Sequence, residues 1–218
     1  CNDYGNSIEV IRDAKKNIEN VSIVLKVYYN YPDRLHKRNR PIIYQIEEAV
    51  KRLKFIPNEF ILQFCCFINF KIFDEDYFSR FINKIKTKYG IRKIYFECFS
   101  VYKYDLKRIG YLNETFREIM TFGVTGFFNF FNRVFLEKDL RIIRELEIPF
   151  MPIGILGKNL KRDISYDIKK NSEMFKNGLI DSIDLNLIFL LSNINDNSFS
   201  FGVTETSSLK NYNDLKSR

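Results

Sequence analysis

Histidine and paired cysteines are the scarcest features of this sequence. It contains one histidine, His36, no tryptophan, and four cysteines without any Cys-x-x-Cys spacing. Zinc sites are built from clustered cysteine and histidine ligands, so no metal site is expected. A disulfide framework is not expected either, because 218 residues that are 45% hydrophobic can bury a sizeable core without cross-links.

Long apolar runs are also absent. No stretch of about eighteen apolar residues occurs, so the sequence predicts no membrane span, and no secretory signal is visible at its start. We therefore expect a cytoplasmic protein without a membrane partner. Because the chain opens with Cys1 rather than methionine, we also expect it to be a fragment or a processed product.

Basic residues outnumber acidic ones, and the formal net charge is +8. A basic protein can bind nucleic acid, an anionic membrane or a phosphorylated ligand. Here the basic residues are scattered in short groups such as Lys37–Arg40 and Lys51–Arg52, and the aromatic residues recur at core spacing. A solvated surface explains this pattern better than a nucleic-acid-binding domain, which we keep as an alternative from another functional class.

Short apolar runs alternate with helical patterns along the chain. The expected strands are residues 21–27, 60–67, 93–99, 123–128, 149–155 and 198–203. The expected helices are residues 8–18, 43–53, 74–90, 106–120, 137–146, 165–175, 183–191 and 207–215. Gly90 is expected to end its helix, and Gly110 is expected to interrupt the helix around it. Alternation of this kind predicts an α/β fold with a parallel sheet.

A (β/α)8 barrel of the TIM type fits this pattern better than an open, doubly wound sheet. No Gly-x-Gly-x-x-Gly follows the first strand, so that dinucleotide fingerprint is missing. A barrel of this type needs eight strands and the sequence predicts about six, so we expect the first two to lie upstream of Cys1. Residues 1–218 are then expected to form a single, incomplete barrel domain.

Two polar residues stand out near the start of the chain. Tyr4 lies in Tyr4-Gly5-Asn6-Ser7, which leads into the first helix, and Lys26 closes an apolar strand. A lysine at the end of a buried strand is costly without a partner or a task. One task fits both residues: the lysine ammonium would lower the pKa of the Tyr4 phenol, so that the phenol can protonate a carbonyl during its reduction.

Four segments of this chain resemble the aldo/keto reductase family. They are Tyr4 to Ile11, the strand Ile23–Val27 with its lysine, the turn Phe99–Tyr102, and the stretch from Ile188 to Thr204. The resemblance runs from Tyr4 to about the last expected helix. It implies a barrel that reduces carbonyl compounds with NADPH, or with NADH, held at the carboxyl ends of the strands.

The resemblance implies a catalytic set of aspartate, tyrosine, lysine and histidine. Tyr4 matches the tyrosine and Lys26 matches the lysine, whereas the aspartate position falls upstream of Cys1. Cys65 stands at the position of the histidine that orients the carbonyl, and a thiol is a weaker hydrogen-bond donor. We therefore expect turnover to be poor or absent unless the missing segment is restored.

The resemblance also implies a set of cofactor contacts. They are Ser100 at the nicotinamide amide, Thr125 in place of a glutamine, Phe150 stacked on the nicotinamide ring, and Gly202, Val203 and Thr204 at the phosphate. Backbone N–H groups at a helix start favour such an anion. Val101 replaces the asparagine that usually follows Ser100, so one nicotinamide contact is missing. Ser208 and Tyr212 stand where the phosphate segment has a basic residue and an asparagine, so the residues do not support a preference for NADP over NAD.

The sequence therefore predicts NAD(P)H-dependent reduction of a small carbonyl compound, such as an aldehyde, a ketone or a sugar-derived substrate. The alternative is a catalytically impaired relative that keeps the barrel and at most nucleotide binding. It is favoured by Cys65 in place of histidine and by Val101 and Thr125. The sequence leaves the oligomeric state open.

Overall fold

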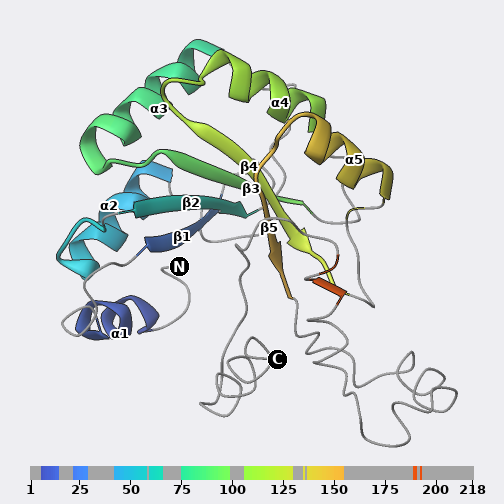
Figure 1. Cartoon of the computed structure of the whole chain (residues 1–218). Coiled ribbons are helices and arrows are strands. Elements are labelled where there is room, and N and C mark those ends of the chain that lie inside the picture. The colour runs from blue at the N-terminus through green and yellow to red at the C-terminus, as the bar shows by residue number, and fades with distance from the viewer. Residues whose placement is uncertain are drawn as a thin grey trace, which may run out of the picture. The chain divides into compact units, whose positions relative to one another are not determined.

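Helices and strands alternate along the chain (Figure 1). The computed structural model describes residues 6–14, 22–28, 42–57, 59–65, 75–98, 106–129, 135, 137–154, 189–190 and 192. The elements are α1 (Ser7–Ala14), β1 (Ser22–Tyr28), α2 (Ile42–Leu53), β2 (Glu59–Cys65), α3 (Glu75–Tyr89), β3 (Lys93–Cys98), α4 (Leu106–Thr115), β4 (Thr121–Phe127), α5 (Glu137–Glu145) and β5 (Phe150–Ile153). The alternation confirms the predicted α/β class.

The five strands form one parallel sheet and are hydrogen-bonded in chain order, from β1 to β5. In the register of the first three strands, Lys26 lies opposite Gln63, and Gln63 lies opposite Tyr95. An open, doubly wound sheet reverses its strand order at a switch point, whereas a (β/α)8 barrel adds each strand beside the previous one. The order is therefore that of part of such a barrel, as the sequence predicts.

The chain divides into two compact units, which are described separately. The first comprises Cys1–Thr125 with Arg141–Pro149, and the second comprises Gly126–Leu140 with Phe150–Arg218. The expectation of a single domain stays a prediction.

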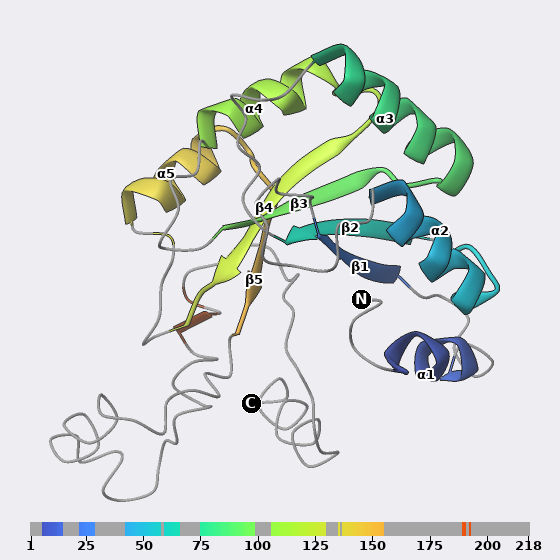
Figure 2. The same cartoon turned by 180° about the vertical axis from the view of Figure 1, so that it is seen from behind.

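An aromatic cluster packs α3 and the end of α4 onto one face of the strands of the first unit. Phe96 on β3 and Phe122 on β4 stack with their ring centroids 6.0 Å apart. Phe122 also meets Phe78 of α3 at 5.8 Å and Phe116, just after α4, at 6.0 Å. Figure 2 shows α2, α3 and α4 along the same side of the strands. Burial of these rings supplies much of the driving force for this packing.

The helix α2 follows from its apolar spacing. Ile46, Ala49 and Leu53 recur at three- and four-residue intervals, and each is at most 2% exposed. Helix α3 repeats the pattern and ends at Tyr89. Gly90 then takes a φ of 67°, and its N–H donates to the carbonyl of Lys86 at 2.9 Å. A left-handed residue of this kind stops a helix, which confirms the predicted role of Gly90.

The predicted interruption at Gly110 is wrong, because α4 runs unbroken from Leu106 to Thr115. Gly110 is buried, and a Cβ atom placed on it would lie 3.0 Å from Cδ1 of Leu146. The absence of a side chain at Gly110 therefore allows Leu146 to pack closely against α4. The local cost of glycine in a helix, about 1 kcal/mol relative to alanine, is offset by this tertiary contact.

Most predicted boundaries agree with the structure to within two residues, and the largest described differences are at helix ends. Helix α4 ends at Thr115, where the sequence predicts an end at residue 120. Helix α1 is described as far as Ala14, and the rest of the predicted helix 8–18 lies outside the described residues. The predicted strand 198–203 and the helices 165–175 and 207–215 lie outside the described residues. Of the predicted helix 183–191, residues 189 and 190 are described, and both are helical.

Candidate functional site

The strands of the first unit carry a second face, opposite the aromatic cluster. Side chains alternate along a strand, so Lys26, Gln63, Tyr95 and Glu97 share the face that Phe96 and Phe122 do not. We call it the inward face. At Gly123 of β4, a Cβ atom would lie 2.5 Å from the Tyr95 ring, so glycine is needed there for Tyr95 to lie across the neighbouring strand.

The amino-terminal end of the inward face carries a polar cluster around Glu59. Ser22 donates a hydrogen bond to Glu59 Oε2 at 2.6 Å, and Lys93 Nζ lies 2.5 Å from Oε1. These contacts lower the pKa of Glu59, with the hydrogen bond from Lys93 as the larger cause. Glu59 and Lys93 are both more than one third exposed, so this cluster ties strand starts together at the surface.

The carboxyl-terminal end carries the ion pair between Lys26 and Glu97. Lys26 Nζ donates to Glu97 Oε1 at 3.1 Å and lies equally close to Oε2. The two residues come from β1 and β3, so the lysine side chain reaches across β2, over the position of Gln63. The carboxylate is 3% exposed and the lysine side chain 23%.

The ion pair supplies the partner that a lysine at the end of a buried strand requires. A buried carboxylate without a counter-charge would cost several kcal/mol, so Lys26 and Glu97 depend on each other. Sequence reasoning singled out Lys26 and missed Glu97. The available signal was a lone acid in the strand Lys93–Cys98, whose side chains are otherwise mostly apolar.

Thr125 adds a buried hydroxyl near the carboxyl end of β4. Its side chain is fully buried, and its Oγ1 has no hydrogen-bond partner among the described residues. By strand alternation it lies on the inward face, opposite in direction to Phe122 and Val124. An unsatisfied buried hydroxyl costs about 1–3 kcal/mol.

In the second unit, Phe150 lies in a cluster of phenylalanines. Its ring meets Phe128 at 5.4 Å and Phe135 at 5.1 Å, both edge to face, and it is 8% exposed. Beside this cluster the Asn129 amide donates to the carbonyl of Gly154 at 2.9 Å. The predicted stacking of Phe150 on a nicotinamide ring stays a prediction.

The remaining predicted site residues are not described as side chains. Tyr4 and Ser100 lie outside the described residues, as do Gly202, Val203 and Thr204. Cys65 is the last residue of β2, and its backbone pairs with Tyr28 of β1. The structure therefore brings Lys26 together with Glu97 and places Cys65 at the same end of the sheet.

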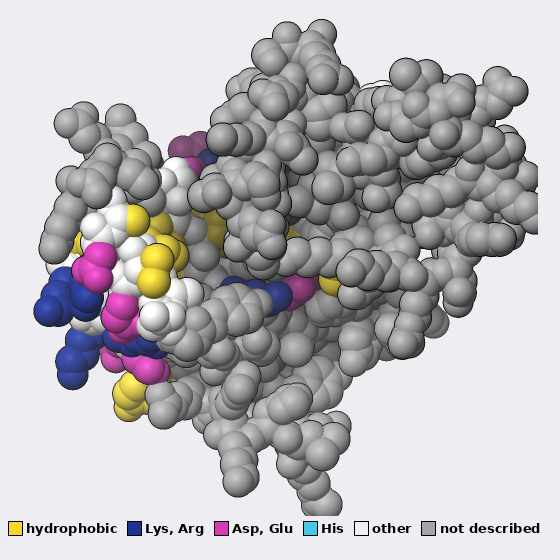
Figure 3. Space-filling model, turned by 90° about the horizontal axis from the view of Figure 1, so that it is seen from below, with side chains coloured by type: hydrophobic (Ala, Val, Ile, Leu, Met, Phe, Trp, Pro, Cys, Tyr) yellow, Lys and Arg dark blue, Asp and Glu magenta, His cyan; other side chains and the backbone are white. Residues whose placement is uncertain are grey.

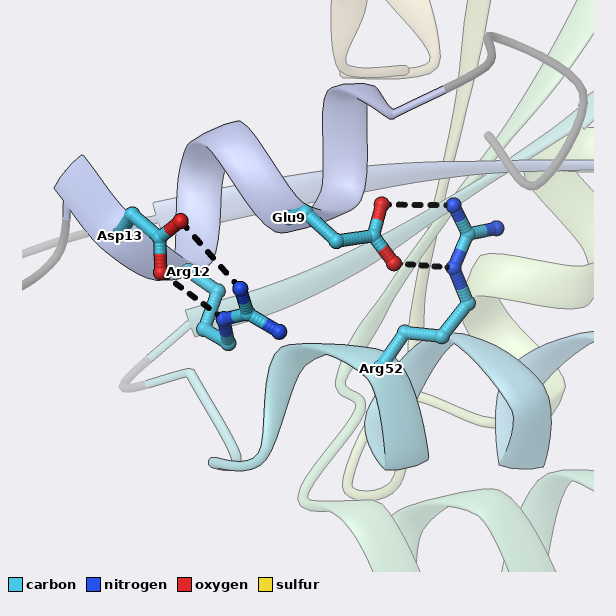
Figure 4. A network of polar contacts seen from close by, with 4 residues as sticks. All are labelled: Glu9, Arg12, Asp13 and Arg52. Carbon is cyan, nitrogen blue, oxygen red and sulfur yellow. Dashed lines mark hydrogen bonds and ion pairs between the residues drawn. The ribbon is translucent and has the colours of Figure 1, made fainter.

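Helix α1, which follows Tyr4 in the sequence, is fastened to α2 by a two-pronged ion pair. Arg52 donates from Nε to Oε1 of Glu9 and from Nη2 to Oε2, both at 2.8 Å (Figure 4). The hydrogen bonds from Arg52 lower the pKa of Glu9 to about 2. Arg12 and Asp13 form a separate pair on the exposed side of α1.

Charged side chains of both signs are interspersed on the described surface. On the face seen in Figure 3, dark blue and magenta side chains lie side by side. Further examples are the ion pairs of Lys88 with Glu47 and of Lys93 with Glu59. Within the described ranges, the helices are too short or too polar to cross a membrane.

No family model and no curated protein matches this sequence. Solved structures do match its fold. An aldo-keto reductase from Bacillus halodurans in its holo form is similar with a TM-score of 0.62 and 14% identity, over 95% of this chain and 70% of that one. An aldo-keto reductase from Klebsiella pneumoniae in complex with NADPH gives 0.64 and 14%, over 96% and 69%.

A glycerol dehydrogenase from Gluconobacter oxydans is similar with a TM-score of 0.57 and 15% identity, over 97% of this chain and 77% of that one. These likenesses extend over nearly the whole chain, although few residues are identical. They agree with the strand order and with the predicted fold class. The chain therefore has the fold of the aldo-keto reductases, a (β/α)8 barrel of which it spans a part.

Proposed function

We propose that this protein reduces small carbonyl compounds with NADPH or NADH. The observation that carries the proposal is the Lys26–Glu97 ion pair at the carboxyl end of the strands. Active sites of (β/α)8 barrels are built at that end. A partly buried lysine held by a buried carboxylate on such a face is better explained by chemistry than by stability, because buried ion pairs contribute little net stability.

In the proposed mechanism Tyr4 is the general acid. Reduction of a carbonyl leaves negative charge on its oxygen, and the Tyr4 hydroxyl donates the proton that neutralises it. The Lys26 ammonium stabilises the resulting tyrosinate, which makes proton donation easier. Cys65, in the position that the resemblance assigns to an orienting residue, can offer the carbonyl only a weak S–H hydrogen bond.

The Thr125 hydroxyl has no hydrogen-bond partner among the described residues, and it fits a nicotinamide cofactor because the carboxamide of such a ring offers both a donor and an acceptor. We propose that Ser100 and Thr125 hold the carboxamide, that Phe150 lies against the ring, and that residues 202–204 hold the phosphate. When bound, the cofactor supplies the hydride. Similar folds solved with NADP or NADPH support this assignment by analogy.

The proposed substrate is a small aldehyde, ketone or sugar-derived carbonyl compound, and the proposed compartment is the cytoplasm. A reducing compartment suits Cys98, a buried free thiol whose pKa is raised to about 12 by burial. Such a thiol is unreactive and serves as a small apolar residue.

A relative that binds the nucleotide without turnover is the second proposal. The replacement of the expected histidine by Cys65 favours it. So does the burial of Phe150, which is 8% exposed in its cluster with Phe128 and Phe135 and therefore leaves little of its ring open to a cofactor.

Two measurements on the full chain test the first proposal. NADPH is titrated while its fluorescence is followed, and NADPH oxidation is then measured with a panel of small aldehydes and ketones. Lys26→Met should keep NADPH binding and lose carbonyl-dependent oxidation. The matched control is Lys93→Met, which removes the other paired lysine of the inward face and should keep both activities.

The outcomes separate the two proposals. Binding with carbonyl-dependent oxidation that Lys26→Met abolishes supports the reductase. Binding without oxidation, in wild type and variants alike, supports the non-catalytic relative. Absence of binding would refute both.

A further inference from the structure

The carboxylate of Glu97 is the most deeply buried charge on the inward face. Its side chain is 3% exposed, and both oxygens lie 3.1 Å from Lys26 Nζ. Oε1 accepts the hydrogen bond of the lysine, whereas Oε2 accepts none from the described residues. Among the described residues, the polar contacts of this carboxylate are thus with the ammonium of Lys26.

The reach of the lysine explains why the pair is specific. Neighbouring strands lie about 4.8 Å apart, so the side chain of Lys26 must extend over one complete strand to meet a residue on β3. An extended side chain has few alternative rotamers once its end is fixed. The contact with Glu97 therefore restricts where the ammonium lies and places a negative charge beside it.

Few other ionisable groups on the described strands share this face. Glu59 and Lys93 pair with each other at the opposite end of the strands. Tyr95 lies in the middle of the face, against Gly123. Among the described acidic residues of this face, Glu97 is the one whose carboxylate lies within ion-pair distance of Lys26, which places it to influence the charge of the lysine.

We propose that Glu97 is a positioning residue: it holds the Lys26 ammonium in place and keeps it protonated at the site where Tyr4 acts. This inference rests on the proposed reductase function. In the resembled family, an aspartate five residues before the tyrosine, a position upstream of Cys1, holds the lysine. Glu97, on β3 and on the far side of β2, is a carboxylate that contacts Lys26 in addition.

The proposal predicts that loss of the Glu97 charge lets Lys26 release its proton at lower pH. An ammonium beside a carboxylate is stabilised in its charged form, commonly by about one pH unit or more. Replacement of Glu97 by glutamine keeps the size and a hydrogen-bond acceptor but removes the charge. The effect is therefore electrostatic and is separable from a packing defect.

The test measures acetylation of Lys26 by acetic anhydride on the full chain across a pH series, with mass spectrometry of the peptide that carries it. Only the neutral amine reacts, so the midpoint of the curve reports loss of the proton. Glu97→Gln should lower this midpoint by about one pH unit or more. Glu97→Asp keeps the negative charge, so its midpoint should lie between those of the wild type and Glu97→Gln. Glu59→Gln, the matched control, should leave the Lys26 midpoint unchanged.

A second readout links the pair to catalysis. Where carbonyl-dependent NADPH oxidation is measurable, Glu97→Gln should move the alkaline limb of the kcat profile to lower pH. Both Lys26 and Tyr4 lose their protons more readily once the negative charge is gone. Glu59→Gln should leave the limb in place.

The two readouts distinguish the possible failures. An unchanged Lys26 midpoint in Glu97→Gln, with native circular dichroism, refutes the role of Glu97 even if the chain reduces carbonyls. A shifted midpoint in a chain that oxidises no NADPH refutes the reductase and with it the catalytic meaning of the pair. A shifted midpoint together with a shifted kcat limb supports both.

Discussion

The two ends of the inward face carry the same kind of contact in different surroundings. At the amino-terminal end, Lys93 and Glu59 pair with 44% and 38% of their side chains exposed. At the carboxyl-terminal end, Lys26 and Glu97 pair with 23% and 3% exposed. An exposed pair contributes up to about 1 kcal/mol, whereas breaking a buried pair costs about 3–5 kcal/mol. The ion pair that is more costly to break thus lies at the end of the strands where barrel enzymes have their active sites.

The largest expected effect comes from removing one partner of the buried pair. Lys26→Met leaves the Glu97 carboxylate buried without a counter-charge and should lower the free energy of unfolding by about 3–5 kcal/mol. Lys93→Met, at the exposed end, should lower it by about 1 kcal/mol or less. Urea denaturation of both variants measures the difference. Equal losses would show that the two ends are energetically alike.

Removing both charges at the buried end should restore most of that loss. The double variant Lys26→Met with Glu97→Leu replaces the ion pair by apolar groups, which is often neutral or stabilising by about 1–4 kcal/mol. We expect near-wild-type stability and no carbonyl reduction. The same denaturation experiment and an NADPH oxidation assay check this. A double variant as unstable as Lys26→Met would mean that Glu97 has further essential contacts.

A smaller effect should follow from the buried hydroxyl at the same end. Thr125→Val keeps the shape of the side chain and removes an Oγ1 without a described partner, so stability should stay equal or rise by about 1 kcal/mol. NADPH should bind more weakly if the hydroxyl holds the carboxamide. Thermal unfolding and NADPH titration measure the two quantities. A clear loss of stability would reveal a hydrogen bond that Thr125 makes in solution.

The smallest expected effect is a pH-dependent loss of stability when the exposed pair of Glu59 and Lys93 is broken. The pKa of Glu59 is lowered from 4.5 by Lys93 and Ser22. A lowered pKa stabilises the folded state above the ordinary value, and this contribution is lost as the pH falls below it. Glu59→Gln should therefore cost stability at pH 7 and little at acid pH, and added salt should reduce the cost. Denaturation at two pH values and two salt concentrations tests this.

Local patterns predicted the elements of this fold well. The spacing of Ile46, Ala49 and Leu53 defined α2, and Gly90 marked the end of α3, because both signals act within one helix. Gly110 misled the prediction, since its reason is a contact with Leu146 on a distant segment. Intrinsic preferences describe a segment alone, and tertiary packing overrides them.

The residues of the candidate site show the same contrast between local sequence signals and tertiary contacts. Lys26 was found from the sequence because a charge in an apolar strand is locally anomalous. Glu97 was missed because its meaning depends on a side chain that crosses a strand to reach it. The resemblance to a family also points to an aspartate near Tyr4 as the lysine's partner, which directs attention away from β3. Only the register of the strands brings the two charges together.

The ion pair between Glu9 and Arg52 has a consequence for the rate of the proposed reaction. Tyr4 lies just upstream of α1 in the sequence, and Arg52 of α2 holds α1 through Glu9. Under the proposed function, a looser α1 would let the phenol spend more of its time out of range of its substrate. A slower catalyst with an unchanged melting temperature could then be traced to an arginine that touches neither substrate nor cofactor.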